Sequence, residues 1–119
     1  MSFVEAVRSA FVQKYADFHG RAGRPEFWWF TLAVVLATLV GGLIDDELLG
    51  GRSIFEGLVG LATVIPSLAV GARRLHDTDR SGWWLILHLF PVIGSIVLIV
   101  FWVMPGTAAQ NRFGPEPTR

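Results

Sequence analysis

The sequence contains no cysteine and little charge, and both absences narrow the functions open to it. Without cysteine the chain can form no disulfide, no thiolate nucleophile and no cysteine-ligated metal site. Charged residues make up 17% of the chain, against about 25% in an average soluble domain. The formal net charge is zero, so the charge balance gives no reason to expect a nucleic-acid partner.

Several signature motifs of enzymes are also missing. The sequence has no Walker loop, no GxSxG nucleophile elbow and no HExxH zinc motif. We therefore expect a non-enzymatic protein, with no catalytic residue, no bound cofactor and no metal.

Apolar residues, in contrast, are abundant. They make up 52% of the chain, the mean hydropathy is +0.50, and the 119 residues allow one domain, residues 1–119. A soluble chain of this size would bury too little of that apolar surface. The composition therefore predicts a single domain that is integral to a membrane.

The clearest apolar run is Trp83 to Met104, which contains no Asp, Glu, Lys or Arg. As a helix its 22 residues would reach about 33 Å, the thickness of the hydrocarbon core of a bilayer. We therefore predict a transmembrane span over residues 83–104. Pro91 and Gly94 leave one alternative, in which the run breaks into a re-entrant hairpin.

Two further spans are predicted over residues 27–44 and 54–72. The first opens with four aromatic residues, as is typical of a headgroup boundary, and the second contains Glu56 near its start and Pro66 in its middle. Small residues recur along each span, which allows helices to pack closely in lipid. We expect the two stripes, Ala33-Ala37-Gly41 and Gly60-Thr63-Ser67-Gly71, to face each other; a homodimer through one stripe is the alternative.

The segments outside the spans complete the predicted fold. Apolar residues in residues 1–19 follow the spacing of an amphipathic helix, which we place in the membrane interface and follow with a turn up to residue 26. Residues 105–119 are rich in proline and glycine and should form an irregular tail. The predicted class is an all-α bundle of three transmembrane helices preceded by an interfacial helix.

Lys and Arg residues are divided unequally between the two sides of such a bundle. The N-terminal segment and the second loop, residues 73–82, carry seven, and the first loop and the tail carry three. The positive-inside rule therefore places the N-terminus and the second loop in the cytoplasm, and the first loop and the tail outside.

This topology gathers a dense polar cluster at one membrane surface. Arginine matches phosphate oxygens with two parallel hydrogen bonds, so the cluster is a candidate contact for anionic lipid or a partner protein. The interpretation we prefer is a clasp of ion pairs, in which Asp77 or Asp79 binds Arg24 or Arg21. The members are Arg21, Arg24, Glu26, Arg73, Arg74, His76, Asp77, Asp79 and Arg80.

Two other groups of polar residues could be considered as metal sites. His76 with Asp77 and Asp79 has the residue types of a metal site or an acid–base pair, but a loop without a second histidine or a cysteine is a poor zinc pattern. The acidic run at residues 45–47 lacks the spaced oxygens of a calcium loop and is expected to be solvated.

His88 is the candidate polar site inside the membrane, because it lies within the third apolar run. An ionisable group at such a depth is a functional hypothesis, for instance as part of a proton relay. The structural alternative is a hydrogen bond to a neighbouring helix, with Thr63 or Ser67 as the partner.

Four segments resemble one family, the YhaH/YhaI-like bacterial inner-membrane proteins, which share a domain of unknown function. Residues 20–28 are similar to its GRxxRxEFW opening, although Pro25 stands where the family more often has Arg or Ser. Residues 65–77 resemble its central signature, and residues 81–84 and 105–115 its later elements. The resemblance covers about residues 11–117 and implies an integral protein of the bacterial inner membrane, but no named reaction.

The resulting functional hypothesis is a small accessory or interaction module of the inner membrane. Its cytoplasmic face of Arg, Asp and Trp would contact anionic lipid or a membrane protein partner, and assembly into a homo-oligomer is a further expectation. The alternative is an oligomeric transporter or channel component for a small ion or solute, with His88 near the path. An enzyme that acts on a lipid headgroup through His76 and Asp77 ranks third.

Overall fold

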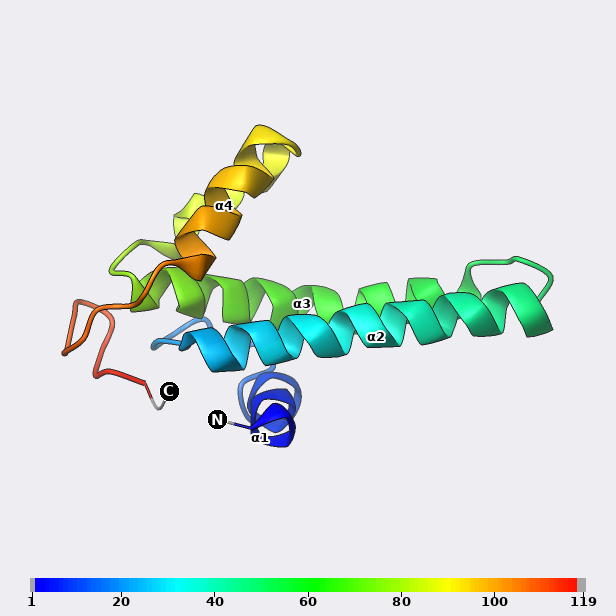
Figure 1. Cartoon of the computed structure of the whole chain (residues 1–119), viewed down its shortest axis with the longest axis horizontal. Helices are drawn as coiled ribbons and strands as arrows, with labels where there is room; N and C mark the ends of the chain where they lie inside the picture. The colour runs from blue at the N-terminus through cyan, green and yellow to red at the C-terminus, as the bar shows by residue number, and fades with distance from the viewer. Residues whose placement is uncertain (1, 118–119) are drawn as a thin grey trace.

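The structure, a computed structural model, describes residues 2–117 and contains no β-strand in that range. The predicted all-helical class is therefore confirmed. Figure 1 shows the arrangement of the elements. In chain order they are α1 (Phe3–Arg8), the π-helical turn η1 (Ser9–Gln13), α2 (Arg24–Leu48), α3 (Ile54–Asp77), the 3-10 helix η2 (Gly82–Leu89) and α4 (Ile93–Val103).

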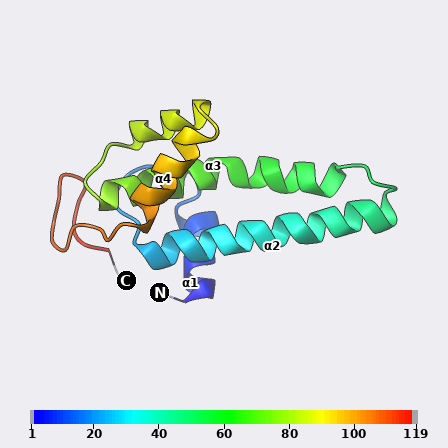
Figure 2. The same ribbon diagram turned by 45° about the horizontal axis from the view of Figure 1, so that its top comes forward.

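Helices α2 and α3 form a long antiparallel pair that dominates the molecule (Figures 1 and 2). The first turn of α2 contains Pro25, whose missing N–H costs nothing there, and Glu26, whose charge suits the helix dipole. The connection between the helices uses Gly50 and Gly51, both at positive φ (64° and 83°). Residues with a side chain rarely adopt this conformation, so the two glycines allow the chain to reverse.

An aspartate at the end of α2 caps the start of α3. The Asp45 carboxylate is buried and accepts hydrogen bonds from the backbone N–H groups of Phe55 at 2.8 Å and Glu56 at 3.1 Å. N–H groups in the first turn of a helix have no acceptor within that helix. The expectation of a fully solvated acidic run is therefore wrong for Asp45, whereas Asp46 and Glu47 are exposed.

Both long helices are apolar enough to cross a membrane, and they contain the predicted spans 27–44 and 54–72. In their most apolar windows, 17% of the residues of α2 and 28% of those of α3 are buried within the chain. A core helix of a soluble protein would be mostly buried, so this exposure fits insertion into a bilayer. Pro66 lies inside α3 without ending it, as membrane helices tolerate.

The two stripes of small residues face each other only in part. Gly41 packs against the start of α3, where a Cβ would lie 3.3 Å from the backbone nitrogen of Glu56. A Cβ on Gly60 would meet no atom within 4 Å, and Gly71 faces Leu85 and Trp102 instead of α2. The predicted pairing of the stripes is therefore wrong at Gly60 and Gly71.

The third apolar run is not one continuous helix. It forms η2 and α4, which double back on each other (Figures 1 and 2). Pro91 lies in the turn between them, where its ring and missing N–H prevent helix continuation, and Gly94 lets α4 approach the main chain of Leu87. The predicted single helix over residues 83–104 is therefore wrong, and the chain takes the form of the hairpin alternative.

The flanking segments pack at one end of the α2–α3 pair. Helix α1 lies across α2 (Figures 1 and 2), and the helical segment Phe3–Gln13 is shorter than the predicted helix over residues 1–19. The tail after α4 is irregular and returns to the end of α3, where the Thr107 N–H donates to the Asp77 carbonyl at 2.7 Å. The prediction that the tail and the second loop lie at opposite sides is therefore wrong.

Replacing Gly94 with alanine should destabilise the protein, because the new Cβ would overlap the main-chain carbonyl of Leu87. Overpacking of this kind costs about 1–3 kcal/mol of unfolding free energy. Thermal unfolding in detergent micelles measures the effect. Gly57→Ala in α3 is the control: a Cβ there meets no atom within 4 Å, so stability should be unchanged or higher. Equal stability of Gly94→Ala and the wild type would contradict the close packing of the hairpin.

Candidate functional site

The Asp77 carboxylate is held between two arginines at the end of α3. Arg21 donates from Nε to Oδ1 at 3.0 Å, and Arg74 donates from Nη1 to Oδ2 at 2.5 Å. The side chains of Asp77 and Arg74 are fully buried, and that of Arg21 is 1% exposed. Arg21 precedes α2 and Asp77 ends α3, so this carboxylate joins two segments that are 56 residues apart.

A second buried carboxylate, Glu26, lies in the first turn of α2. Arg73 Nη1 donates to both of its oxygens, at 3.1 and 2.8 Å, and the Ser9 hydroxyl donates to one of them at 3.0 Å. Glu26 therefore links α3 to the N-terminal helical segment. We call the five charged residues of these two sites the clasp: Arg21, Glu26, Arg73, Arg74 and Asp77.

The clasp contains three arginines and two carboxylates, so backbone carbonyls share in binding the guanidinium groups. Arg21 donates to the carbonyls of Thr107, Ala109 (2.6 Å) and Gly114 (3.2 Å) in the tail. Arg74 donates to the carbonyls of Trp102 (3.0 Å) and Met104 at the end of α4. These bonds use the several N–H groups that arginine presents in a fixed plane.

Arg73 is the least satisfied member of the clasp. Its Nε donates to the Asp17 carbonyl at 3.1 Å, but within residues 2–117 its Nη2 is buried without a hydrogen-bond acceptor. All of the guanidinium is buried, so this Nη2 receives neither a protein acceptor nor exposure to solvent. A buried donor without a partner is costly, and the Glu26 bonds therefore have to offset it.

The main chain of the tail can pack directly against the Asp77 carboxylate because residue 106 is a glycine. A Cβ at Gly106 would overlap the Asp77 carboxylate. Sequence reasoning did not single out Gly106 as part of the site, nor Ser9 or Thr107. The available signal for Gly106 was its place in the Pro105-Gly106 element of the family resemblance.

His76 lies beside the clasp and is bound on three sides. Its Nδ1 donates to the Gly20 carbonyl at 2.9 Å, and its ring stacks on Phe113 with the centroids 4.0 Å apart and the planes at 4°. Asn111 Nδ2 donates to the His76 carbonyl at 2.9 Å. Among residues 2–117 no group of three His, Asp or Glu residues is placed to hold a metal ion.

Three other residues of the predicted cluster lie outside the clasp. Arg24 is exposed and donates to the Val103 carbonyl at 3.4 Å. Of the alternative pairings predicted for the clasp, the structure forms that of Arg21 with Asp77 and not that of Arg24. Asp79 instead forms an exposed pair with Arg112 at 3.1 Å. The Arg80 guanidinium lies 4.2 Å above the Phe101 ring, a cation–π contact.

His88 is exposed on η2 and lines an apolar groove of about 380 Å³ between α2, α3 and the hairpin. Ser67 also lines this groove, but the structure of residues 2–117 shows no hydrogen bond between it and His88. The Thr63 hydroxyl donates to the Val59 carbonyl within its own helix at 2.8 Å. Neither predicted partner therefore binds His88 within the described chain.

The chemistry of the clasp is that of a structural centre. Both of its carboxylates accept bonds from arginine, and all five side chains are at most 5% exposed. The segments that carry the family resemblance also meet here: residues 20–26, 73–77, 105–106 and 111–114 all contribute to the clasp or to the contacts around it.

Comparison with known proteins gives one consistent result. The family model described as "Protein of unknown function (DUF805)" matches residues 15–115. The chain is 46% identical to inner membrane protein YhaH of Escherichia coli K12 over 110 residues, which cover 89% of this chain and 91% of YhaH. It is 44% identical to inner membrane protein YhaI of the same strain over 109 residues, 89% of this chain and 90% of YhaI. No solved structure matches the chain.

A double-mutant cycle tests the central pair. Arg21→Ala and Asp77→Ala should each cost about 3–5 kcal/mol of unfolding free energy, because each removes an oppositely charged partner from a buried charge. Their effects should also be non-additive by about 1 kcal/mol or more, as for residues in direct contact. Arg24→Ala with Asp77→Ala is the matched cycle, and these two effects should add. Additive effects of Arg21→Ala and Asp77→Ala would contradict the clasp.

Proposed function

This chain belongs to the DUF805 family of proteins of unknown function, and on that premise we propose that it is a non-enzymatic interaction module of the bacterial inner membrane. The observation that carries the proposal is that both clasp carboxylates are paired with arginines of the same chain. Glu26 and Asp77 are buried and bound by arginine, which leaves neither free to act as a general acid or base. The polar cluster therefore stabilises a fold, and other surfaces make contacts.

In the arrangement that we propose, α2 and α3 cross the bilayer and the η2–α4 hairpin enters and leaves it on one side. The hydrogen bonds of Arg21 to the tail support this, because they hold the tail beside the end of α3. Eight of the nine described Lys and Arg residues then belong to segments at the clasped end, and Arg52 alone belongs to the opposite loop; Arg119 lies outside the described residues. The positive-inside rule favours a cytoplasmic clasped end.

Single-cysteine labelling tests this arrangement, and the natural chain contributes no cysteine of its own. Gln110→Cys in the tail and Thr78→Cys in the second loop should both be protected from a membrane-impermeant maleimide added to intact spheroplasts. Glu47→Cys in the last turn of α2, beside the opposite loop, should react. A third crossing would place Gln110→Cys outside, and its reaction in intact spheroplasts would contradict the hairpin arrangement.

The contacts that we propose for the module are with anionic lipid. The clasp arginines are buried and cannot reach a lipid headgroup. We therefore assign the lipid contact to cations outside the clasp. Arg8 and Arg24 are exposed, and the neighbouring Trp28 and Trp29 are exposed as well. Tryptophan prefers the headgroup level, and the cytoplasmic leaflet attracts basic residues near the membrane, so these four exposed residues make up the lipid-contacting surface that we propose.

Native mass spectrometry of the delipidated protein titrated with cardiolipin tests the lipid contact. The double variant Arg8→Gln/Arg24→Gln should weaken binding by at least about tenfold, because each cation at the surface contributes about 1 kcal/mol. Arg52→Gln, at the opposite end of the molecule, is the matched control and should bind as the wild type does. An equal loss of cardiolipin binding in Arg8→Gln/Arg24→Gln and in Arg52→Gln, or no loss in either variant, would contradict the proposed surface.

The alternative function, an oligomeric transporter or channel, has less support. A path for an ion or polar solute needs polar lining, and the groove that contains His88 is lined mainly by apolar and aromatic side chains. Among the residues that the structure describes, His88 is the one ionisable residue in that lining.

A further inference from the structure

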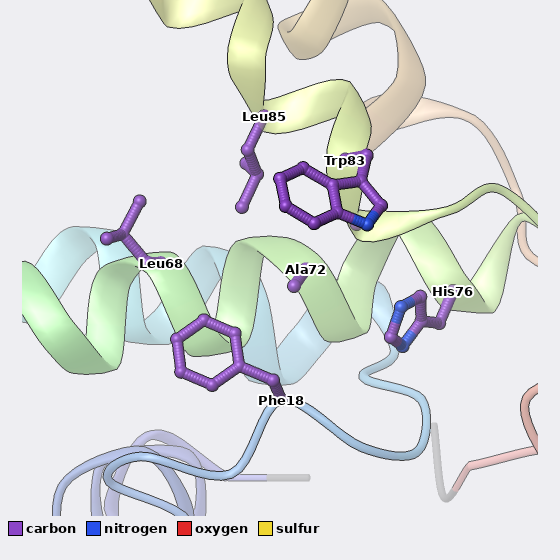
Figure 3. A pocket seen from close by; sticks show the side chains of 7 residues that line it. Phe18, Leu68, Ala72, His76, Trp83 and Leu85 are labelled. Atoms are coloured by element: carbon purple, nitrogen blue, oxygen red, sulfur yellow. The ribbon is translucent and has the colours of Figure 1, made fainter.

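A second cavity, separate from the clasp, opens between the N-terminal segment, α3 and η2. Its volume is about 420 Å³, within the range of small-molecule sites. Figure 3 shows the side chains around it. Phe18 comes from the N-terminal segment, Leu68, Ala72 and His76 come from α3, and Trp83 and Leu85 come from η2.

One end of this cavity presents a hydrogen-bond acceptor. His76 Nδ1 is bonded to the Gly20 carbonyl, which only accepts, so Nδ1 carries the hydrogen. In the neutral ring Nε2 then carries the lone pair, and the structure of residues 2–117 shows no hydrogen bond to it. The adjacent Gly82 has no side chain to cover Nε2, since a Cβ there would lie 3.5 Å from it.

A hydrogen-bond donor lies at the same end. Trp83 is 83% exposed, and within residues 2–117 its indole N–H has no hydrogen-bond partner. In Figure 3 the nitrogen edge of the Trp83 indole lies on the His76 side of the cavity. The polar end therefore offers one acceptor and one donor, which is the complement of a hydroxyl group.

The rest of the cavity is apolar and runs away from the clasp. Leu68 precedes His76 by eight residues, which is about 12 Å along α3. Phe18, Leu68 and Leu85 line this deeper part (Figure 3). Among residues 2–117 no Arg or Lys lines the cavity, so this part of the chain supplies no cation for a phosphate group there.

We propose that this cavity binds a neutral lipid alcohol, with the hydroxyl group between His76 and Trp83 and the hydrocarbon chain along α3 toward Leu68. The ligand then has the orientation of a membrane lipid, with its polar end at the clasped end of the molecule. The site is independent of the proposed anionic-lipid surface, because none of the residues of that surface (Arg8, Arg24, Trp28 and Trp29) lines the cavity.

The test uses the full chain in phosphatidylcholine nanodiscs and two photoreactive probes, a diazirine-bearing dodecanol and its methyl ether. The ether keeps the chain but loses the hydroxyl donor to His76. After illumination, peptide mass spectrometry should find the alcohol on residues that line the cavity, at about fivefold the level of the ether, as expected for one lost hydrogen bond. Equal labelling by the two probes, or alcohol spread evenly over the exposed faces of α2 and α3, would overturn the proposal.

Three variants separate this site from general lipid contact. Trp83→Phe removes the indole donor and should lower labelling by the alcohol by about threefold or more. Leu68→Trp should fill the apolar part and abolish labelling of the cavity. Leu61→Trp is its matched control on the same helix, because Leu61 is 73% exposed, and it should change nothing. Unchanged labelling in both Trp83→Phe and Leu68→Trp would overturn the assignment even if the alcohol is bound elsewhere.

Discussion

The ionic contacts of one carboxylate, that of Asp77, are the interaction on which the other packing depends. Each of its oxygens accepts a bond from an arginine of a different segment, and all three side chains are buried. A buried carboxylate that loses such a partner is strongly destabilising, so these segments have to remain together. Arg21 and Arg74 also bind carbonyls of the tail and of the end of α4. A single charge thereby positions four parts of the chain.

The distribution of polar contacts suits a protein that lies in lipid. Apolar faces gain little by meeting one another there, because the surrounding hydrocarbon is equally apolar. Helices α2 and α3 are instead joined by polar contacts near both ends. The clasp joins them at one end, and the Asp45 carboxylate binds the first turn of α3 at the other. Close approach at Gly41 adds to the second junction.

The sequence was sufficient for the features that depend on composition and on local pattern. The length and apolarity of α2 and α3 were predictable, and Arg21 with Asp77 was among the pairings considered. The hairpin was predictable only as an alternative. A run of 22 apolar residues has the length of a bilayer crossing, and its composition is the same whether it forms one helix or is broken at Pro91. The return of the tail was not predictable from side chains. Arg21 and Arg74 bind main-chain carbonyls of the tail and of the end of α4, and since every residue carries a main-chain carbonyl, no residue type marks these contacts. The Asp45 cap was not predicted, because the carboxylate accepts from N–H groups of another helix, ten and eleven residues further along the chain.

The bonds between Arg21 and the tail have a consequence for biosynthesis. Arg21 leaves the ribosome more than 80 residues before the Ala109 and Gly114 carbonyls that it binds. Until the tail has been made, this guanidinium has Asp77 as its partner but lacks the tail carbonyls. The five residues of the clasp have all been made once α3 ends, whereas the tail carbonyls that bind Arg21 follow only after the hairpin. A chain that ends before the tail would therefore lack part of the hydrogen bonding of the Arg21 guanidinium.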